Sequence, residues 1–345
     1  MILLAAIVLL VALLAALAAG LILAERWLIY TGPCQIHING GELIIDTQAG
    51  QSLLQALLDS EIYLPSSCGG QGTCGLCKLR AISGAGPLLP TEQGFLSRHE
   101  VQQGQRLACQ IKLRGDVEIS LPEQILNVTM YQATVVHVQD HSPTLREIHL
   151  QLPAEADWPY QPGQYIQIEA PSPDGTVFRA YSPCPVTEDS LRLAMLVRLV
   201  PGGIGSTYLH SLTIGQQVRF TGPYGQFDLQ DDPDAAIICV GGGCGLASIR
   251  SIVDAVCQRW PHRHVQMFYG CRSPQEAVWM DHFTALAETN PGFQFLYALS
   301  DTPPANWTGP TGQIHHILAQ QLPPAPDAHA FLCGPEPMIQ AVRQT

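Results

Sequence analysis

Four cysteines carry the most specific chemical signal in this sequence. Cys68, Cys74 and Cys77 lie in one glycine-rich segment, with five and then two residues between them, and Cys109 follows later in the chain. Four thiolates are what a [2Fe–2S] cluster needs, two for each iron. Glycines let the backbone curl round such a cluster and turn N–H groups toward its sulfides. The pattern therefore predicts an iron–sulfur site.

Two other roles for these thiols fit less well. A zinc site usually draws on two paired CxxC or CxxH units, and this chain has one CxxC, Cys74 to Cys77. A disulfide framework forms in an oxidising compartment. The nucleotide motif described below for residues 241–245 instead suggests a reducing one. We expect the other seven cysteines to be small, buried, apolar residues in a reducing compartment. They are Cys34, Cys184, Cys239, Cys244, Cys257, Cys271 and Cys333.

Length and charge limit the class of protein. A chain of 345 residues can form two or three domains, each with its own core. The formal net charge is −12 and only 13% of the residues are charged. Because no basic stripe is present, the sequence argues against a nucleic-acid partner.

The first 24 residues predict a membrane anchor. Met1 to Ala24 contains no charged residue and would span about 36 Å as a helix, enough for a hydrocarbon core of about 30 Å. A cleaved signal peptide is the alternative, but it needs a basic start and a shorter apolar stretch. Arg26, Trp27 and Tyr30 follow, as interfacial anchors do. We expect a retained single transmembrane helix within a first segment, residues 1–30.

Residues 31–125 predict a β-grasp ferredoxin-type domain. Residues 35–39 and 42–46 are short alternating strands around a Gly-Gly turn, which indicates a hairpin. Residues 52–59 have the apolar stripe of a helix that packs on a sheet. Further strands are expected at residues 78–82, 106–113 and 117–121. The order of two strands, a helix and more strands places the cysteine loop directly after the helix.

Residues 129–230 predict a small antiparallel β-barrel. Candidate strands separated by turn residues are 133–138, 145–152, 165–169, 191–200 and 217–221. Arg179-Ala180-Tyr181-Ser182 lies among them and by itself is typical of an ordinary strand end. A cofactor-binding role becomes more credible because a glycine turn at 201–205 follows in the sequence, with Ser206 and Thr207 at an expected helix start. N–H groups and hydroxyls at such a turn can hold a pyrophosphate.

Residues 231–345 predict an α/β nucleotide-binding domain. An apolar strand at 236–240 runs into Gly241-Gly242-Gly243-Cys244-Gly245 and then into an apolar helix at 246–257. Strand, glycine turn and helix together favour a dinucleotide phosphate site. Further strands are expected at 265–269, 293–299 and 331–333, the last ending in Cys333-Gly334-Pro335. The His262/His264 and His315/His316 pairs lack carboxylate or cysteine partners and do not indicate a metal site.

These motifs, in this order, resemble the ferredoxin–NADP⁺-reductase superfamily with a [2Fe–2S] domain placed first. Within it the chain is similar to the F-subunit family of Na⁺-translocating NADH:quinone oxidoreductases, over nearly its whole length. The quoted matches are Ser67-Cys68-Gly69-Gly70, Leu88-Leu89-Pro90-Thr91-Glu92, Arg106-Leu107-Ala108-Cys109-Gln110, Tyr165–Pro171, Arg179-Ala180-Tyr181-Ser182, Leu299-Ser300-Asp301, Asn306-Trp307-Thr308-Gly309 and Cys333-Gly334-Pro335. The chain departs from that family in the short segment 172–178 and in ending at Thr345 soon after its last motif.

The resemblance implies roles residue by residue. Cys68, Cys74, Cys77 and Cys109 would hold the cluster. FAD would meet Arg179 at a phosphate, Tyr181 by stacking, Ser182 near the flavin N5, and Ser206 and Thr207 at the pyrophosphate. The NADH pyrophosphate would face Gly241, Gly242, Gly243 and Gly245, and Cys333 would lie near the nicotinamide, so that Ser182 and Cys333 flank the reacting atoms. A site without an obvious set of Arg and Lys residues for a 2′-phosphate suits NADH better than NADPH, although Arg272 leaves both open.

The predicted protein is a membrane-anchored oxidoreductase that passes electrons from NADH through FAD to a [2Fe–2S] cluster and on to a membrane acceptor. The resemblance implies quinone as the indirect acceptor, membrane-embedded redox subunits as partners, and Na⁺ transport as the coupled process. NADH and reduced thiols place the soluble domains in the cytoplasm, at the inner membrane. One alternative is the reductase component of an oxygenase. A second, of another class, is a non-catalytic redox sensor or assembly protein that holds a cluster.

Overall fold

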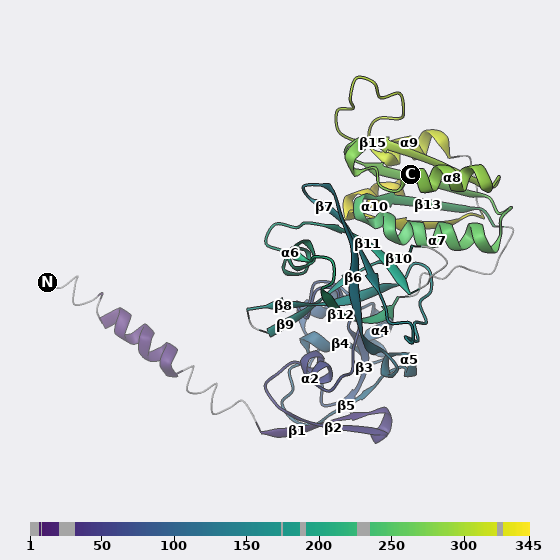
Figure 1. Cartoon of the computed structure of the whole chain (residues 1–345). Coiled ribbons are helices and arrows are strands. Elements are labelled where there is room, and N and C mark those ends of the chain that lie inside the picture. The colour runs from purple at the N-terminus through teal and green to yellow at the C-terminus, as the bar shows by residue number, and fades with distance from the viewer. Residues whose placement is uncertain are drawn as a thin grey trace. The chain divides into compact units, whose positions relative to one another are not determined.

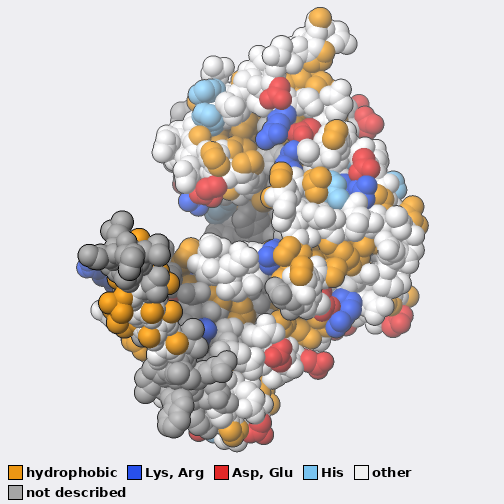
Figure 2. Space-filling view, turned by 90° about the vertical axis from the view of Figure 1, so that its left-hand side faces the viewer, with side chains coloured by type: hydrophobic (Ala, Val, Ile, Leu, Met, Phe, Trp, Pro, Cys, Tyr) orange, Lys and Arg blue, Asp and Glu red, His pale blue; other side chains and the backbone are white. Residues whose placement is uncertain are grey.

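The computed structural model describes residues 7, 9–20, 32–173, 175–186, 191–225, 235–322 and 327–345. It forms two compact units, Met1–Val128 and Thr129–Thr345, which are described separately. The described residues near the N-terminus form a helix, drawn in purple in Figure 1. Its apolar side chains, such as Leu9, Leu13 and Leu17, are exposed and form the orange surface of this helix in Figure 2.

The expected membrane anchor falls mostly outside the described part of the chain. Of Met1 to Ala24, only residues 7 and 9–20 are described, and Arg26, Trp27 and Tyr30 lie outside it. Among the described residues, no helix combines the length and the apolar character needed to cross a bilayer.

From residue 32 onward, the first unit is a five-stranded mixed sheet with one main helix. Its strands are β1 (Pro33–Ile38), β2 (Leu43–Gln48), β3 (Lys78–Ser83), β4 (Gln105–Leu107) and β5 (Val117–Ser120), in the order β2-β1-β5-β3-β4. Only the β1–β5 pair is parallel. Alternate residues of β1 are buried under α2 (Leu53–Asp59), which begins where the Ser52 hydroxyl accepts the Gln55 N–H at 3.2 Å. Short helical turns, η1 (Asn39–Gly41), α3 (Pro90–Gln93), α4 (Arg98–Gln102), η2 (Ala108–Gln110) and α5 (Glu123–Leu126), connect the rest.

One expected strand is shorter than the sequence predicted. The strand expected at 106–113 ends at Leu107, because the chain turns into η2 to carry Cys109 toward the cysteine loop. The Ala108 N–H still donates to the Cys77 carbonyl at 2.9 Å, and Ile111 and Leu113 return to the core beyond the turn. The order of two strands, a helix and further strands is the one that the sequence predicted.

The second unit begins with a seven-stranded antiparallel sheet in the order β10-β11-β7-β6-β12-β8-β9. The strands are β6 (Thr129–Ser142), β7 (Leu145–Gln151), β8 (Tyr165–Ser172), β9 (Gly175–Tyr181), β10 (Pro183–Pro185), β11 (Arg192–Arg198) and β12 (Gln217–Tyr224). Register shifts interrupt β6 against β7 and β12 against β8, as bulges that bend a sheet do. Sequence analysis missed β9 and β10, which frame the Arg179–Ser182 motif.

The rest of the second unit is a four-stranded parallel sheet with helices on both faces (Figure 1). Its strands are β13 (Ile237–Gly242), β14 (Val265–Cys271), β15 (Phe293–Leu299) and β16 (His329–Cys333), in the order β15-β14-β13-β16. Ile237 and Cys239 face a core shared with α7 (Leu246–Arg259) and α8 (Met280–Thr289). Ile238 and Val240 face α9 (Ile314–Gln321) and α10 (Glu336–Gln344). This alternation explains why β13 is apolar throughout.

Candidate cofactor sites

Glycines shape the loop that carries three of the four cysteines. Gly69, Gly70, Gly72 and Gly75 have φ angles of 65°, 87°, 73° and 67°, a region that side chains rarely adopt. A Cβ at Gly72 would also lie 2.5 Å from Nε2 of Gln110. Glycine at residue 72 therefore suits both the positive φ angle of the loop and the present position of the Gln110 side chain.

The four sulfurs gather as two pairs. The Cys74 thiol donates to Cys68 Sγ at 3.3 Å, and the Cys77 and Cys109 side chains are hydrogen-bonded to each other. In the described residues, no group of three or more His, Cys, Asp or Glu side chains converges as a single metal ion requires. Two pairs of thiols are the donor set for a centre with two irons, each taking two thiolates. The residues present thus fit a [2Fe–2S] cluster better than one ion.

Two of these thiols lie in surroundings that favour the thiolate. Burial acts to raise the pKa of Cys68, but N–H groups of Thr73 and Gln71, the Thr73 side chain and the Cys74 thiol lower it to about 6. The hydrogen bond from Cys77 lowers the pKa of Cys109 to about 7, helped by the Gly72 N–H and the Gln110 side chain. The same bond, together with burial, raises the pKa of Cys77. Thiolates are the ligand form, so the backbone donors already suit an anionic centre.

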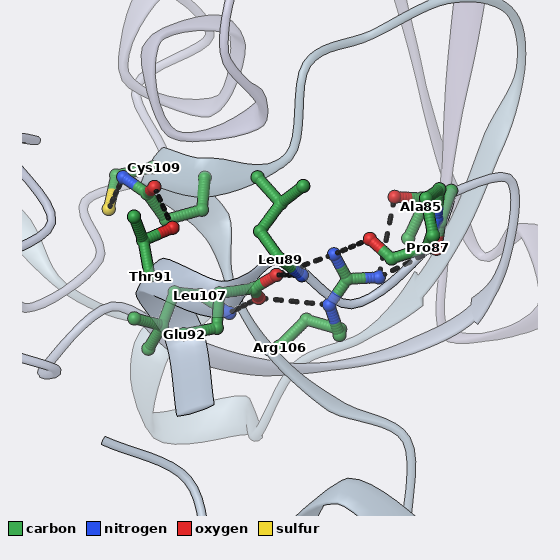
Figure 3. A network of polar contacts seen from close by, with 10 residues as sticks. Ala85, Pro87, Leu89, Thr91, Glu92, Arg106, Leu107 and Cys109 are labelled. Carbon is green, nitrogen blue, oxygen red and sulfur yellow. Dashed lines mark hydrogen bonds and ion pairs between the residues drawn. The ribbon is translucent and has the colours of Figure 1, made fainter. Parts of the chain in front are cut away.

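A buried ion pair fixes the segment that leads to Cys109 (Figure 3). Glu92 accepts from Arg106 Nε and Nη2 at 2.9 and 2.7 Å, from the Leu107 N–H at 3.0 Å and from the Leu89 N–H at 2.9 Å. Arg106 donates further to the carbonyls of Ala85, Gly86 and Pro87. Glu92 is fully buried, and although burial acts to raise its pKa, these donors keep the pKa of its carboxyl lowered.

In the second unit, the start of α6 (Ile204–Ser211) brings the expected flavin residues together. A Cβ at Gly205 would lie 2.8 Å from Cγ of Arg179 and 2.9 Å from the hydroxyl of Tyr181. Burial raises the pKa of Tyr181 to about 12, so this phenol stays neutral. Ser182 follows directly and is half-buried. The helix N-terminus therefore faces a cation and an aromatic ring, a surface suited to a phosphate and a planar ring system.

Ser206 and Thr207 differ in their surroundings. The Ser206 hydroxyl is buried, accepts the Val200 N–H at 3.1 Å and donates within its own turn, to the Gly203 carbonyl at 3.2 Å. Thr207 is exposed. Both residues lie inside the first turns of α6 rather than at its cap, which is Gly203. Thr207 therefore presents its hydroxyl outward, whereas Ser206 braces the turn.

The glycine loop after β13 lies against Cys333. β13 and β16 are parallel neighbours in which Gly241 pairs with Cys333, and a Cβ at Gly245 would lie 2.4 Å from the Cys333 carbonyl oxygen. The Cys333 thiol donates to the Ser248 hydroxyl at 3.5 Å, and burial raises the pKa of this thiol. The loop leads directly into the N-terminus of α7, where helix N–H groups lack partners within the helix.

Sequence analysis missed an ion pair beside this loop. Arg198, at the end of β11, donates from Nη1 and Nη2 to the two carboxylate oxygens of Glu276 at 3.0 and 2.9 Å. A Cβ at Gly243 would lie 3.4 Å from Arg198 Nη2, so the guanidinium borders the glycine loop. Hydrogen bonds from Arg198 lower the pKa of Glu276. The signal available in the sequence was Arg198 itself, a charged residue at the end of an apolar strand and shortly before the glycine turn at 201–205.

A second missed feature joins the antiparallel and parallel sheets of this unit. Glu147 accepts from Nε2 of His141 at 2.7 Å, from Nε2 of His149 at 2.6 Å and from the indole N–H of Trp279 at 3.0 Å. Trp279 also lies under the guanidinium of Arg250, 4.6 Å from the ring centroid. No short motif in the sequence connects Glu147 with Trp279.

Comparisons with known proteins match all three regions of the chain. A 2Fe-2S iron-sulfur cluster binding domain matches residues 36–114, an oxidoreductase FAD-binding domain matches residues 132–229, and an oxidoreductase NAD-binding domain matches residues 239–344. These matches bear out the expected cofactors: a [2Fe–2S] cluster, FAD and NADH.

The relatives agree with this division. The F subunit of a Na⁺-translocating NADH-quinone reductase from Marinomonas sp. is 34% identical over an alignment 379 positions long, which covers 97% of this chain and 92% of that protein. Among solved structures, an Amycolatopsis cytochrome P450 reductase, GcoB, is 30% identical with a TM-score of 0.70, covering 90% of this chain and 95% of its own. The ferredoxin reductase in carbazole 1,9a-dioxygenase is 28% identical with a TM-score of 0.66, covering 90% and 93%.

Proposed function

The chain belongs to the F-subunit family of Na⁺-translocating NADH-quinone reductases, and from that premise we propose which of its residues serve the electron route. It is an oxidoreductase subunit in which electrons pass from NADH through FAD to a [2Fe–2S] cluster and on toward quinone. A flavin accepts the two electrons of a hydride together and releases them singly, as a one-electron cluster requires. The likeness over 97% of the chain carries this conclusion.

We propose that Cys68 and Cys74 hold one iron and that Cys77 and Cys109 hold the other. The two sulfur pairs support this division, and the Gly72, Gln71 and Thr73 N–H groups would face the cluster sulfurs. We further propose three domains: a ferredoxin-type domain at 31–125, an antiparallel β-barrel flavin domain at 129–230 and an NADH-binding domain at 231–345.

In the flavin domain, Arg179 is placed to neutralise an FAD phosphate and Tyr181 to stack on the isoalloxazine. Their contact with the backbone of Gly205 supports the pairing of this cation and this ring at one site. Thr207 can donate its exposed hydroxyl to the pyrophosphate, whereas Ser206 shapes the turn that presents those N–H groups. Ser182 would lie beside the reacting edge of the ring.

In the NADH-binding domain, the loop Gly241-Gly242-Gly243-Cys244-Gly245 is placed to take the pyrophosphate at the start of α7. Cys333 would lie near the nicotinamide, because its strand ends beside that loop. The Arg198–Glu276 pair borders Gly243 and fixes the edge of the loop. Ser182 and Cys333 are therefore the residues that we assign to the two sides of hydride transfer.

We assign residues 1–30 as a single transmembrane anchor. The relatives are named as subunits of a quinone reductase that translocates Na⁺, and such an enzyme works in a membrane with further subunits. We place the soluble domains on the cytoplasmic side, where NADH is available. Membrane-embedded redox subunits would take electrons from the cluster to quinone and couple that transfer to Na⁺ transport.

One observation favours a second candidate function. The cytochrome P450 reductase and the carbazole dioxygenase ferredoxin reductase match 90% of this chain with TM-scores of 0.70 and 0.66. Both are reductases by name, one of a cytochrome P450 and the other of a dioxygenase. The same internal electron route could therefore serve an oxygenase, and the acceptor decides between the two functions.

A pair of variants tests the electron route and the acceptor. Cys74→Ala is expected to lose its iron, keep FAD and still reduce ferricyanide with NADH, because the cluster and the flavin occupy separate cores. It should no longer support NADH-dependent quinone reduction in membranes. Deleting residues 1–24 should also abolish quinone reduction while leaving ferricyanide reduction and iron content intact.

The opposite pattern would favour the oxygenase reductase. In that case the truncated protein would drive a soluble hydroxylase at the full rate, and the intact protein in membranes would show no quinone-linked activity. Zinc in place of iron in anaerobically purified protein would contradict the cluster assignment itself.

A further inference from the structure

The structure contains a side-chain relay that ends on one of the cluster cysteines. The Thr91 hydroxyl donates to Oε1 of Gln110 at 2.8 Å, and Nε2 of Gln110 donates to Sγ of Cys109 at 3.5 Å. We propose that Gln110 tunes the reduction potential of the [2Fe–2S] cluster through this N–H···S hydrogen bond, and that Thr91 orients its amide. The proposal rests on the cluster assignment made above.

The chemistry of the two neighbours fixes the orientation of the amide. A ligating thiolate can only accept a hydrogen bond, so the nitrogen of the carboxamide must face Cys109. Its oxygen then faces Thr91, whose hydroxyl is able to donate. With the amide reversed, an oxygen lone pair would face the thiolate, and that arrangement is repulsive.

Thr91 and Gln110 are held in place from both sides. Thr91 directly precedes Glu92, whose carboxylate accepts the Leu107 N–H and pairs with Arg106, so the two segments are fixed to each other (Figure 3). On the other side Gly72 leaves the room that the amide occupies, since a Cβ there would lie 2.5 Å from Gln110 Nε2. The Gly72 N–H also donates to Cys109.

Such a donor has a definite effect on the potential. Reduction adds an electron to a centre that four thiolates already make anionic, and hydrogen bonds to the sulfurs help to set its potential. A donor interacts more strongly with the more negative reduced state, so it stabilises that state and raises the potential. Loss of the Gln110 N–H is therefore expected to lower the potential.

The test uses the full-length protein with its cluster. Gln110→Leu should lower the midpoint potential of the cluster by about 59 mV, which is a tenfold change in the one-electron equilibrium constant. An EPR-monitored redox titration measures this potential. Gln110→Glu keeps an acceptor for Thr91 but brings a negative charge to the sulfur, so its potential should be lower still. Thr91→Val, which touches no cysteine, should shift the potential in the same direction by less.

The matched control is Gln103→Leu, in which the same amide is lost from a residue that contacts His99 on the surface. Its potential should equal that of the wild type. A Gln110→Leu protein with full iron content and an unchanged potential would overturn the proposal. If Gln110→Leu fails to retain iron, Thr91→Val decides, and an unchanged potential there would likewise overturn it. Absence of iron from the wild type would instead refute the cluster assignment.

Discussion

Glu92 in the first unit and Glu147 in the second are buried carboxylates that each accept from several donors, but the donors differ in kind. In the first unit Glu92 is fully buried and pairs with Arg106, a permanent cation. In the second unit Glu147 is 5% exposed and accepts from two imidazoles and an indole, which donate without needing a charge. If the carboxylate is lost, the first arrangement leaves a buried guanidinium without its counter-charge, and the second leaves ring N–H groups without their acceptor.

The two carboxylates also differ in the segments of the chain that they connect. Glu92 connects the segments that carry Thr91 and Cys109, so it supports a loop whose sulfurs must stay in place. Glu147 connects strand β7 to Trp279 next to α8, so it supports the contact between two sheets. We expect loss of the carboxylate charge to cost more at Glu92, where a guanidinium would stay buried without a counter-charge, than at Glu147, where ring N–H groups are the donors.

The largest expected effect is on the Glu92 pair. Glu92→Gln leaves the Arg106 guanidinium buried without a counter-charge, which should lower the free energy of unfolding of the first unit by about 3–5 kcal/mol. Denaturant unfolding followed by the visible absorption of the cluster measures this unit. Glu42→Gln, at an exposed position, is the control and should change little. Equal denaturation midpoints for the two variants would contradict the importance given to the pair.

The corresponding change in the second unit should cost less. Glu147→Gln keeps an amide oxygen that can accept one of the three donors, so we expect a loss of about 1.5–3 kcal/mol, the range for hydrogen bonds to a charged group. Tryptophan fluorescence reports this unit through Trp158, Trp260, Trp279 and Trp307. Glu155→Gln, which is exposed, is the matched control. A loss equal to that of Glu92→Gln would remove the distinction between the two carboxylates.

The sequence predicted those parts of the sites that depend on residue type and local order. Four cysteines at fixed spacing predicted a [2Fe–2S] domain, and a glycine run between an apolar strand and a helix predicted an NAD-binding domain; the matches at residues 36–114 and 239–344 confirm both domains. Arg179 and Tyr181 were assigned to the flavin site because they form a short motif, and that assignment stays a prediction; the strand that carries them, β9, was missed. In each of these regions most of the signal lies within a few neighbouring residues, although Cys109 follows Cys77 by 32 positions.

The buried polar contacts escaped prediction because their partners are distant in the chain. Trp279 and Glu147 are separated by 132 positions, and Arg198 and Glu276 by 78. Alternation of polar and apolar residues indicates which face of a strand is buried, but it does not name the partner of a buried charge. Leu107 likewise ends its strand early because Cys109 must turn toward the other cysteines, a tertiary requirement.

Acid should weaken the second unit through Glu147. Burial acts to raise the pKa of this carboxyl, but His141, His149 and Trp279 together lower it. Its pKa when folded is then below the usual value of about 4.3, so its contribution is present above that pH and is lost as the pH falls through the folded pKa. Fluorescence-monitored unfolding at about pH 5 and about pH 3 should show a steeper loss for the wild type than for Glu147→Gln. Parallel losses would show that this carboxyl does not titrate differently on folding.

The smallest expected effect separates the indole from the imidazoles. Trp279→Phe removes one neutral N–H donor at 3.0 Å and leaves Glu147 with its two histidines, so the loss should be about 1 kcal/mol. The phenyl ring keeps a face for Arg250, which now lies 4.6 Å from the indole centroid, so most of that contact should persist. Calorimetry is the suitable measurement because the substitution removes a fluorophore, and Trp260→Phe is the control for loss of an indole. In a Glu147→Gln background the same substitution should cost less, because two groups in one hydrogen-bonded set are not additive. Equal costs in both backgrounds would mean that Trp279 stabilises the unit through packing and not through Glu147.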